Sequence, residues 1–148
     1  MIKVLTFYLY GNLLGIDVTL VKEINRNVCY TAVPGSRKHI AGLLNMRGQV
    51  VTLFDLAELL TLKKENPQNS SIRTCIILKT PRDPDQVGIL IDRPGDVIDI
   101  DSEECEPPPA NVGGVENEFI SSIVKLEGEL LILIDPQKVF SDRGIFEV

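Results

Sequence analysis

Apolar residues recur in short runs along the chain, and residues typical of turns separate these runs. Alternation and β-branched content predict strands rather than long helices. The predicted strands are Lys3–Leu9, Leu13–Val18, Ile40–Met46, Gln49–Phe54, Arg73–Lys79, Val87–Asp92, Asp96–Ile100 and a final pair within Ile120–Ile134. Val21–Ile24 fits either a strand or a helical turn, and periodicity alone does not decide between them.

One passage of the chain occurs twice. Ile40–Leu60 aligns without gaps on Ile120–Phe140, at an offset of 120 − 40 = 80 residues. A weaker similarity aligns Gly15–Ile24 with Gly88–Val97, and each of these segments precedes its copy of the longer repeat. We therefore expect two related units with a seam between them, and seams between units are common binding sites.

Each repeated passage predicts a hairpin followed by a short helix. Gly48 and Gly128 stand at the second turn position, where a primed hairpin turn requires positive φ. Asp55 and Asp135 follow the returning strands and are typical helix N-caps. Successive hairpins favour a mainly β fold of two small antiparallel barrels over an α/β sheet.

The 148 residues fit one domain with two halves, at roughly residues 10–70 and 71–140, between which terminal strands can cross over. The polar stretch Lys63–Ser71 is the predicted linker. Other segments without a regular pattern are Asn25–Lys38, Pro81–Asp85, Ser102–Glu118 and the tail Ser141–Val148.

Composition excludes several classes of partner. The net charge is −6 and the pI about 4.8, so nucleic acid is disfavoured. No apolar run approaches the roughly 18 residues of a membrane span. Three widely spaced cysteines, Cys29, Cys75 and Cys105, indicate reduced thiols in a cytoplasm rather than disulfides or a zinc site. We expect Cys75, within a strand, to be buried.

Few side chains are candidates for catalysis or metal binding. Asp55 and Asp135 would form an acidic hydrolase or transferase site only if they converged across the seam, and capping is the simpler interpretation. His39, the single histidine, is expected to be exposed, and one histidine makes a catalytic triad or metal site hard to assemble. The acidic run Asp99–Glu104 lacks the glycine and spaced glutamate of a calcium loop. We predict no metal or other cofactor.

Arg47 differs from the other candidates. The turn dipeptide is Arg47-Gly48 in the first unit and Glu127-Gly128 in the second, so turn chemistry does not require arginine. A guanidinium on a rigid hairpin tip could reach a partner carboxylate. The alternative is an ordinary exposed arginine.

The stretch Pro34–Leu60 resembles the N-(L/M)-R-G hairpin of the CheW family, the coupling proteins of bacterial chemotaxis. Asn45-Met46-Arg47-Gly48 carries the core of the motif, and the Gly15, Gly88 and Phe119–Leu133 regions are similar to looser family motifs. The resemblance covers nearly the whole chain. It implies two five-stranded SH3-like barrels with a groove between them.

The resemblance also implies a non-enzymatic adaptor. Its partners would be the regulatory domain of the histidine kinase CheA and the cytoplasmic tip of a chemoreceptor, in receptor arrays at the inner face of the membrane. By motif, Arg47, Val21 and Glu23 would lie at partner-binding surfaces, with Val97 as a further candidate. A scaffold in a cluster unrelated to swimming and a small acidic-site hydrolase stay open as alternatives.

Overall fold

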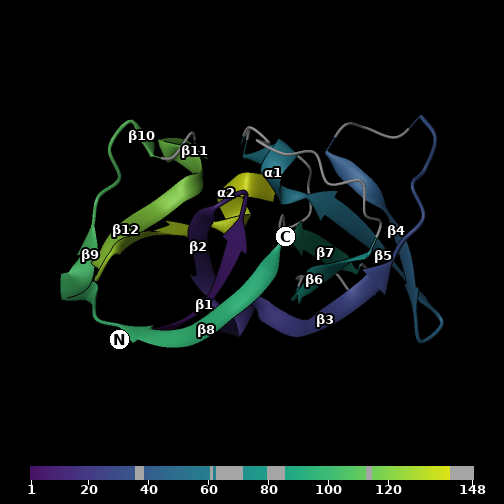
Figure 1. Cartoon of the computed structure of the whole chain (residues 1–148), viewed down its shortest axis with the longest axis horizontal. Helices are drawn as coiled ribbons and strands as arrows, with labels where there is room; N and C mark the ends of the chain where they lie inside the picture. Colours follow the sequence, from purple (N-terminus) through teal and green to yellow (C-terminus); the bar gives the residue numbers. More distant parts are fainter. Residues whose placement is uncertain (36–38, 61, 63–71, 80–85, 113–114, 141–148) are drawn as a thin grey trace.

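Two β-sheets lie side by side in the computed structural model of the chain, which describes residues 1–35, 39–60, 62, 72–79, 86–112 and 115–140 (Figure 1). Sheet A has six strands, in the order β8 (Arg93–Ile100), β1 (Ile2–Leu9), β2 (Asn12–Asp17), β13 (Glu129–Ile134), β12 (Ile120–Leu126) and β9 (Cys105–Glu106). Sheet B has five, in the order β3 (Val21–Cys29), β6 (Ile72–Leu78), β7 (Val87–Ile91), β5 (Gln49–Asp55) and β4 (Ile40–Met46).

Short elements complete the fold. The helices α1 (Leu56–Leu59) and α2 (Pro136–Phe140) follow the repeated hairpins, and β10 (Asn111–Val112) pairs with β11 (Val115–Glu116). The described residues also form the 3-10 turns η1 (Val18–Leu20), η2 (Ser102–Glu104) and η3 (Asn117–Phe119). Among the described residues, no helix is long and apolar enough to cross a membrane.

The mainly β prediction is confirmed, but the expected pair of five-stranded barrels differs in detail. Sheet A has a sixth strand, β9, because the chain after β8 turns through η2 and pairs again with β12. In the part of the chain that the structure describes, the strand ladders close neither sheet. Sheet B comes nearest to closing into a barrel, because Thr31, which follows β3, and Leu43 of β4 exchange two backbone hydrogen bonds of 3.0 and 2.8 Å.

Each sheet contains strands from both sides of residue 70, so the two sheets do not correspond to the two halves of the sequence. The hairpin β1–β2 lies in sheet A, between β8 and β13, although it precedes all of sheet B in sequence. The hairpin β6–β7 lies in sheet B, between β3 and β5, although it follows the linker. Each half of the chain therefore gives its first hairpin to the centre of the other half's sheet, and β1 and β2 lie in the middle of the molecule (Figure 1).

The two parallel strand pairs share one register, which the sequence did not predict. Leu53 of β5 lies opposite Gly88 of β7, and its counterpart Leu133 of β13 lies opposite Gly15 of β2. Both glycines are needed for close packing, because a Cβ at Gly15 would lie 2.6 Å from Val4 Cγ1 and one at Gly88 2.8 Å from Leu53 Cδ2. The glycines of the weaker repeat thus lie where β2 pairs with β13 and where β7 pairs with β5.

The described residues form three apolar clusters that hold the fold together. One lies within each sheet, and the largest joins the two sheets and both helices. This central cluster includes Phe7 and Leu14 from sheet A, Ile76 and Ile89 from sheet B, and Phe140 from α2, all at most 1 % exposed. Burial of such side chains contributes roughly 1.5–3 kcal/mol each, so the sheets are stabilised together.

Several segments predicted to be irregular are ordered. Asn25–Cys29 continues β3, because a register shift between Asn25 and Val28 keeps it paired with β6. Ser102–Glu118 contains η2, β9, β10, β11 and part of η3, although residues 113–114 lie outside the described part. Short elements of this kind leave little periodic signal in a sequence. The predicted linker Lys63–Ser71, loop Pro81–Asp85 and tail Ser141–Val148 lie outside the described residues.

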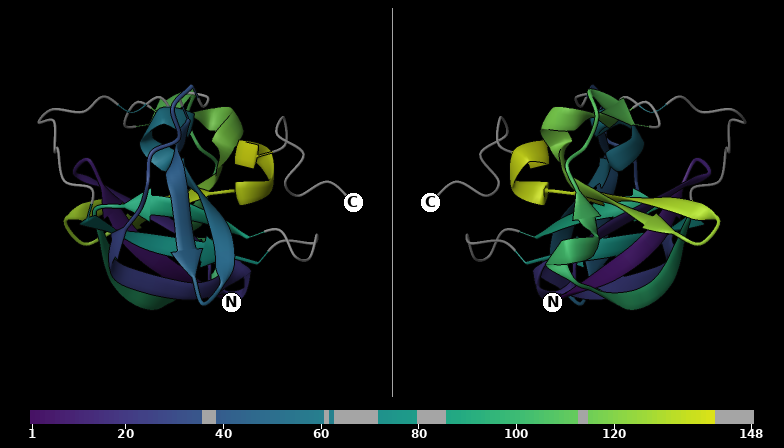
Figure 2. Two further views of the ribbon diagram at one scale, coloured as in Figure 1. Left: turned by 90° about the vertical axis from the view of Figure 1, so that its right-hand side faces the viewer. Right: turned by 90° about the vertical axis from the view of Figure 1, so that its left-hand side faces the viewer.

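Val21–Ile24, which the sequence left open between a strand and a helical turn, is a strand. The strand predicted at Leu13–Val18 ends at Asp17, because η1 follows. Positive φ is present at Gly48 (+81°) and Gly128 (+78°), as the hairpin turns require. The views along the long axis in Figure 2 show the β4–β5 hairpin at one end of the molecule and β9 with β12 at the other.

Candidate partner-binding surface

Arg47 and Glu23 form an ion pair that joins the β4–β5 hairpin tip to β3. Arg47 Nη2 donates to Glu23 Oε1 at 2.5 Å, across 24 residues of sequence. The arginine side chain is 72 % exposed and the glutamate 28 % exposed. The structure therefore brings together two of the four residues that the resemblance singled out.

The backbone of Arg47 is unusual. Its φ is +50°, and that of Gly48 is +81°, so both central residues of the turn are left-handed, as in a type I′ turn. A non-glycine residue in this region costs roughly 1–2 kcal/mol. An exposed ion pair contributes about 0–1 kcal/mol to stability, so the pair does not explain on stability grounds why arginine occupies this position.

Val21 begins β3, two residues before Glu23. It is half-buried and packs against the central apolar cluster, and its backbone register partner is Leu78 of β6. A polar substitution at this position would therefore disturb both the surface beside Glu23 and the edge of the core.

Val97 lies on the other sheet. It sits on β8 opposite Leu5 of β1, and its side chain is 50 % exposed. No ion pair or hydrogen bond described in the structure joins it to Arg47, Glu23 or Val21. Its counterpart in the repeat is Ile24, which lies opposite Ile76 and is 38 % exposed. Sequence reasoning did not select Ile24, although the alignment of Glu23-Ile24 with Asp96-Val97 was the signal that could have found it.

A second apolar surface went unpredicted. Leu43 and Val50 lie on the outer face of the β4–β5 hairpin and are 38 % and 59 % exposed. Leu44, Val51 and Leu53 alternate with them and point inward to the apolar cluster of sheet B. The sequence shows only a continuous apolar run here, so nothing in it separates inward residues from outward ones. We call Leu43 and Val50 the outer hairpin face.

Asp55 and Asp135 are helix caps, as predicted. Asp55 Oδ1 accepts a hydrogen bond from the Glu58 backbone N–H at 3.3 Å, and Asp135 Oδ1 accepts one from Gln137 at 3.0 Å. The two carboxylates thus serve separate helices. Among the described residues, no group of three or more His, Cys, Asp or Glu side chains could hold a metal ion.

His39 and the cysteines give a mixed result. The expectation of an exposed His39 is wrong, because its imidazole is half-buried and stacks on Phe54 with the ring centroids 5.8 Å apart. The buried Cys75 is confirmed, at 0 % exposure, and burial is the main cause that raises the pKa of its thiol to about 11. All three cysteines are free.

Comparison with known proteins agrees with this architecture. The profile of the CheW-like domain family matches residues 3–144. The "Chemotaxis protein CheW" of Bacillus subtilis is 35% identical over 142 residues, which cover 96% of this chain and 88% of the relative. That of Thermotoga maritima is 28% identical and covers 98% and 91%. The crystal structure of the scaffolding protein TtCheW from Thermoanaerobacter tengcongensis superimposes with a TM-score of 0.79 at 27% identity, covering 94% and 87%.

Proposed function

This chain belongs to the family of CheW-like domains, and we propose that it couples the kinase CheA to chemoreceptors in chemotactic signalling, as a scaffold that presents surfaces and performs no reaction of its own. Its relatives are named chemotaxis proteins, and the similar solved structure is that of a scaffolding protein. The site of action would be the receptor array at the inner face of the membrane.

The observation that carries the proposal is the left-handed Arg47 on an exposed hairpin tip. Glycine would adopt this backbone conformation without a Cβ penalty, so the turn itself does not require arginine. Glu23 engages one nitrogen of the guanidinium, and the group carries five N–H donors in a planar fork. The remaining donors would bind a carboxylate on a partner helix.

The receptor tip would therefore lie against Arg47, Glu23 and Val21, where a charged group stands beside a half-buried apolar residue. Val97, on the far side of the sheet boundary, would extend this contact. The outer hairpin face would dock on the regulatory domain of the kinase, because exposed valine and leucine gain from burial in an interface. The receptor would then contact the tip of the β4–β5 hairpin together with β3, and the kinase would contact the outer hairpin face.

The test is co-sedimentation of the full chain with receptor fragments and kinase, with kinase activity as a second readout. Arg47→Gly should reduce recovery with the receptor by about tenfold, because it removes a charge-assisted contact worth at least ~1.4 kcal/mol. Its free energy of unfolding should stay within about 1 kcal/mol of wild type, since the turn prefers glycine. Val50→Asp should instead reduce recovery with the kinase.

Lys125→Ala is the matched control. Lys125 is 74 % exposed and pairs with Glu106 at 3.6 Å, so the variant also removes an exposed cation from an ion pair. It should leave both recoveries unchanged. Equal losses for Arg47→Gly and Lys125→Ala, or a receptor contact insensitive to Arg47, would contradict the assignment of this surface.

A further inference from the structure

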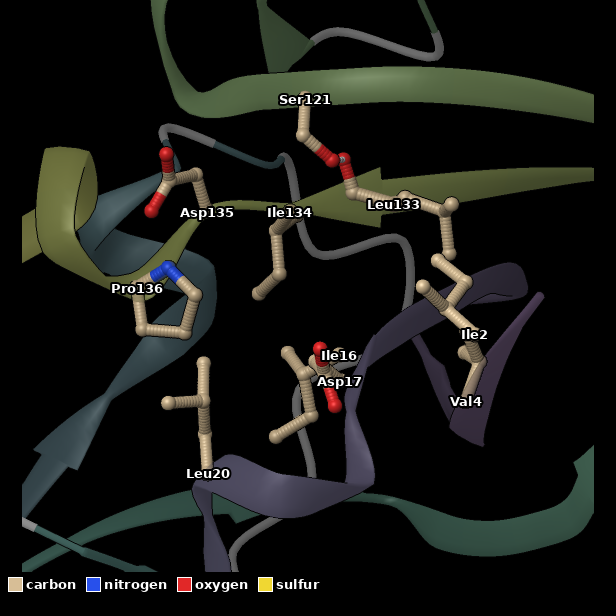
Figure 3. A pocket seen from close by; sticks show the side chains of 10 residues that line it. All are labelled: Ile2, Val4, Ile16, Asp17, Leu20, Ser121, Leu133, Ile134, Asp135 and Pro136. Carbon is tan, nitrogen blue, oxygen red and sulfur yellow. Dashed lines mark hydrogen bonds between the residues drawn. The ribbon is translucent and has the colours of Figure 1, made fainter. Parts of the chain in front are cut away.

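An open cavity lies in sheet A, away from the Arg47 hairpin. Its volume is about 190 Å³, well above the roughly 10–15 Å³ that one water requires on the same measure. Apolar side chains from β1, β2, η1, β13 and α2 form most of its lining, among them Ile2, Ile16, Leu20 and Pro136 (Figure 3). The cavity can therefore accommodate an apolar chain segment.

Two carboxylates also line this cavity, at Asp17 and Asp135. Figure 3 shows them on different sides of Ile134. Asp17 Oδ1 accepts from the backbone N–H and the hydroxyl of Thr19, at 2.9 and 2.8 Å, and Asp135 Oδ1 accepts from Gln137. Within the described part of the chain, neither forms an ion pair. Each carboxylate keeps its second oxygen for another donor.

The corresponding position in sheet B already holds an arginine. Leu5 lies opposite Val97 in sheet A and Ile76 opposite Ile24 in sheet B, so Ile2 and Arg73, three residues earlier in each strand, correspond. The Arg73 side chain is only 12 % exposed and pairs with Asp92 at 3.1 Å. Asp92 also accepts from the Tyr10 backbone N–H at 2.8 Å.

Asp55, the counterpart of Asp135, belongs to the same group of charges. Burial is the main cause that raises the Tyr10 pKa, and the charge of Asp55 raises it further while Arg73 lowers it. Sheet B thus contains an internal guanidinium, which pairs with Asp92. Sheet A has Asp135 at the position that corresponds to Asp55, and it also has Asp17. Its residue at the position that corresponds to Arg73 is Ile2.

We propose that the cavity beside Asp17 and Asp135 binds an arginine side chain of a protein partner. The methylene stem would lie on the apolar lining, and the guanidinium would donate to the carboxylates, as Arg73 does toward Asp92. Arginine fits better than lysine, because its planar fork can bind a carboxylate with two N–H groups at once. The cavity shares no lining residue with the surfaces of the proposed adaptor role, although Leu20 directly precedes Val21, and the proposal does not depend on that role.

The probe is the tripeptide acetyl-Ala-Arg-Ala-amide, titrated into the isotope-labelled full chain and followed by amide chemical shifts. Its citrulline analogue has a similar shape without the charge. The arginine peptide should shift the amides of Asp17–Leu20 and Asp135–Gln137 in a saturable manner, and the citrulline peptide should not. Shifts confined to other surfaces, or equal shifts with both peptides, would overturn the proposal.

Three variants sharpen the result. Asp17→Asn and Asp135→Asn remove a charge but keep an oxygen that can cap the following turn, and each should weaken binding by about fivefold. Asp55→Asn makes the same change at the counterpart in sheet B and should leave the affinity unchanged. An equal loss in Asp55→Asn would show a general charge effect and refute the site.

Ile2→Arg supplies the missing guanidinium within the chain. Ile2 is 41 % exposed, so the substitution does not disrupt the core. The new side chain should occupy the cavity and abolish the peptide shifts. Undiminished binding to this variant, with its fold verified by amide dispersion, would contradict the proposed mode of recognition.

Discussion

At the scale of residues, burial separates three cysteines that look alike in the sequence. Cys75 is fully buried, Cys105 is half-buried and Cys29 is exposed. The pKa of Cys75 rises from its ordinary value of 9.0 to about 11, first through burial and then through the charge of Glu23. Because the thiolate is the reactive form, Cys75 is chemically silent in the folded protein.

We predict that a thiol reagent at pH 8 modifies Cys29 in the native protein and leaves Cys75 intact until denaturant is added. Mass spectrometry of digested samples provides the measurement. Rapid native modification of Cys75 would show that this strand opens locally.

The same thiol makes stability depend on pH in the alkaline range. Its folded pKa lies above its unfolded pKa, so the stabilising effect is complete below about pH 9 and is lost as pH rises toward 11. Cys75→Ala should therefore flatten the fall in unfolding free energy between these values, and an unchanged slope would exclude the effect.

At the scale of elements, each repeated hairpin ends in an acid that starts a helix. Asp55 and Asp135 both accept backbone N–H hydrogen bonds from the first turn that follows. These helices have only four and five residues, and helices so short have little stability of their own. Their caps and the packing of Leu56 and Phe140 into the central cluster therefore hold them in place.

Asp55→Ala should lower the free energy of unfolding by about 1 kcal/mol, because the Glu58 N–H loses its acceptor. Asp55→Asn should retain most of the stability, since asparagine caps equally well. Chemical denaturation measures both variants. A larger loss for asparagine than for alanine would show that the charge, rather than the cap, matters at this position.

At the scale of the whole molecule, the exchange of hairpins makes the two halves interdependent. A cut between residues 70 and 71 separates β6 and β7 from the strands they join, β3 and β5. It likewise separates β1 and β2 from β8 and β13. Each half thus lacks the centre of its own sheet, although each carries a full copy of the repeat.

Fragments 1–70 and 71–148 should therefore be unfolded alone and regain dispersed amide spectra only when mixed. Fragment 18–92, of similar length, contains all five strands of sheet B and is the matched control. It should have more strand content by circular dichroism than fragment 1–70, while exposing its side of the central cluster. Cooperative thermal unfolding of fragment 1–70 by itself would contradict this interdependence.

Much of this architecture could be predicted from the sequence, because it depends on local chemistry. Glycine at positive φ, aspartate before a helix and alternating apolar residues act over a few positions, so the hairpins at Arg47-Gly48 and Glu127-Gly128 were predictable. The 80-residue repeat adds the expectation of two similar sheets. The motif around Arg47 indicates the family and its adaptor role.

The tertiary structure decided what depends on contacts between distant residues. Which hairpin enters which sheet is set by the parallel pairings of Leu53 with Gly88 and of Leu133 with Gly15, and no local pattern encodes a partner. The ion pair of Glu23 with Arg47 and the stacking of His39 on Phe54 likewise join separate strands. Strand order follows from the burial of a shared core, which is a property of the whole chain.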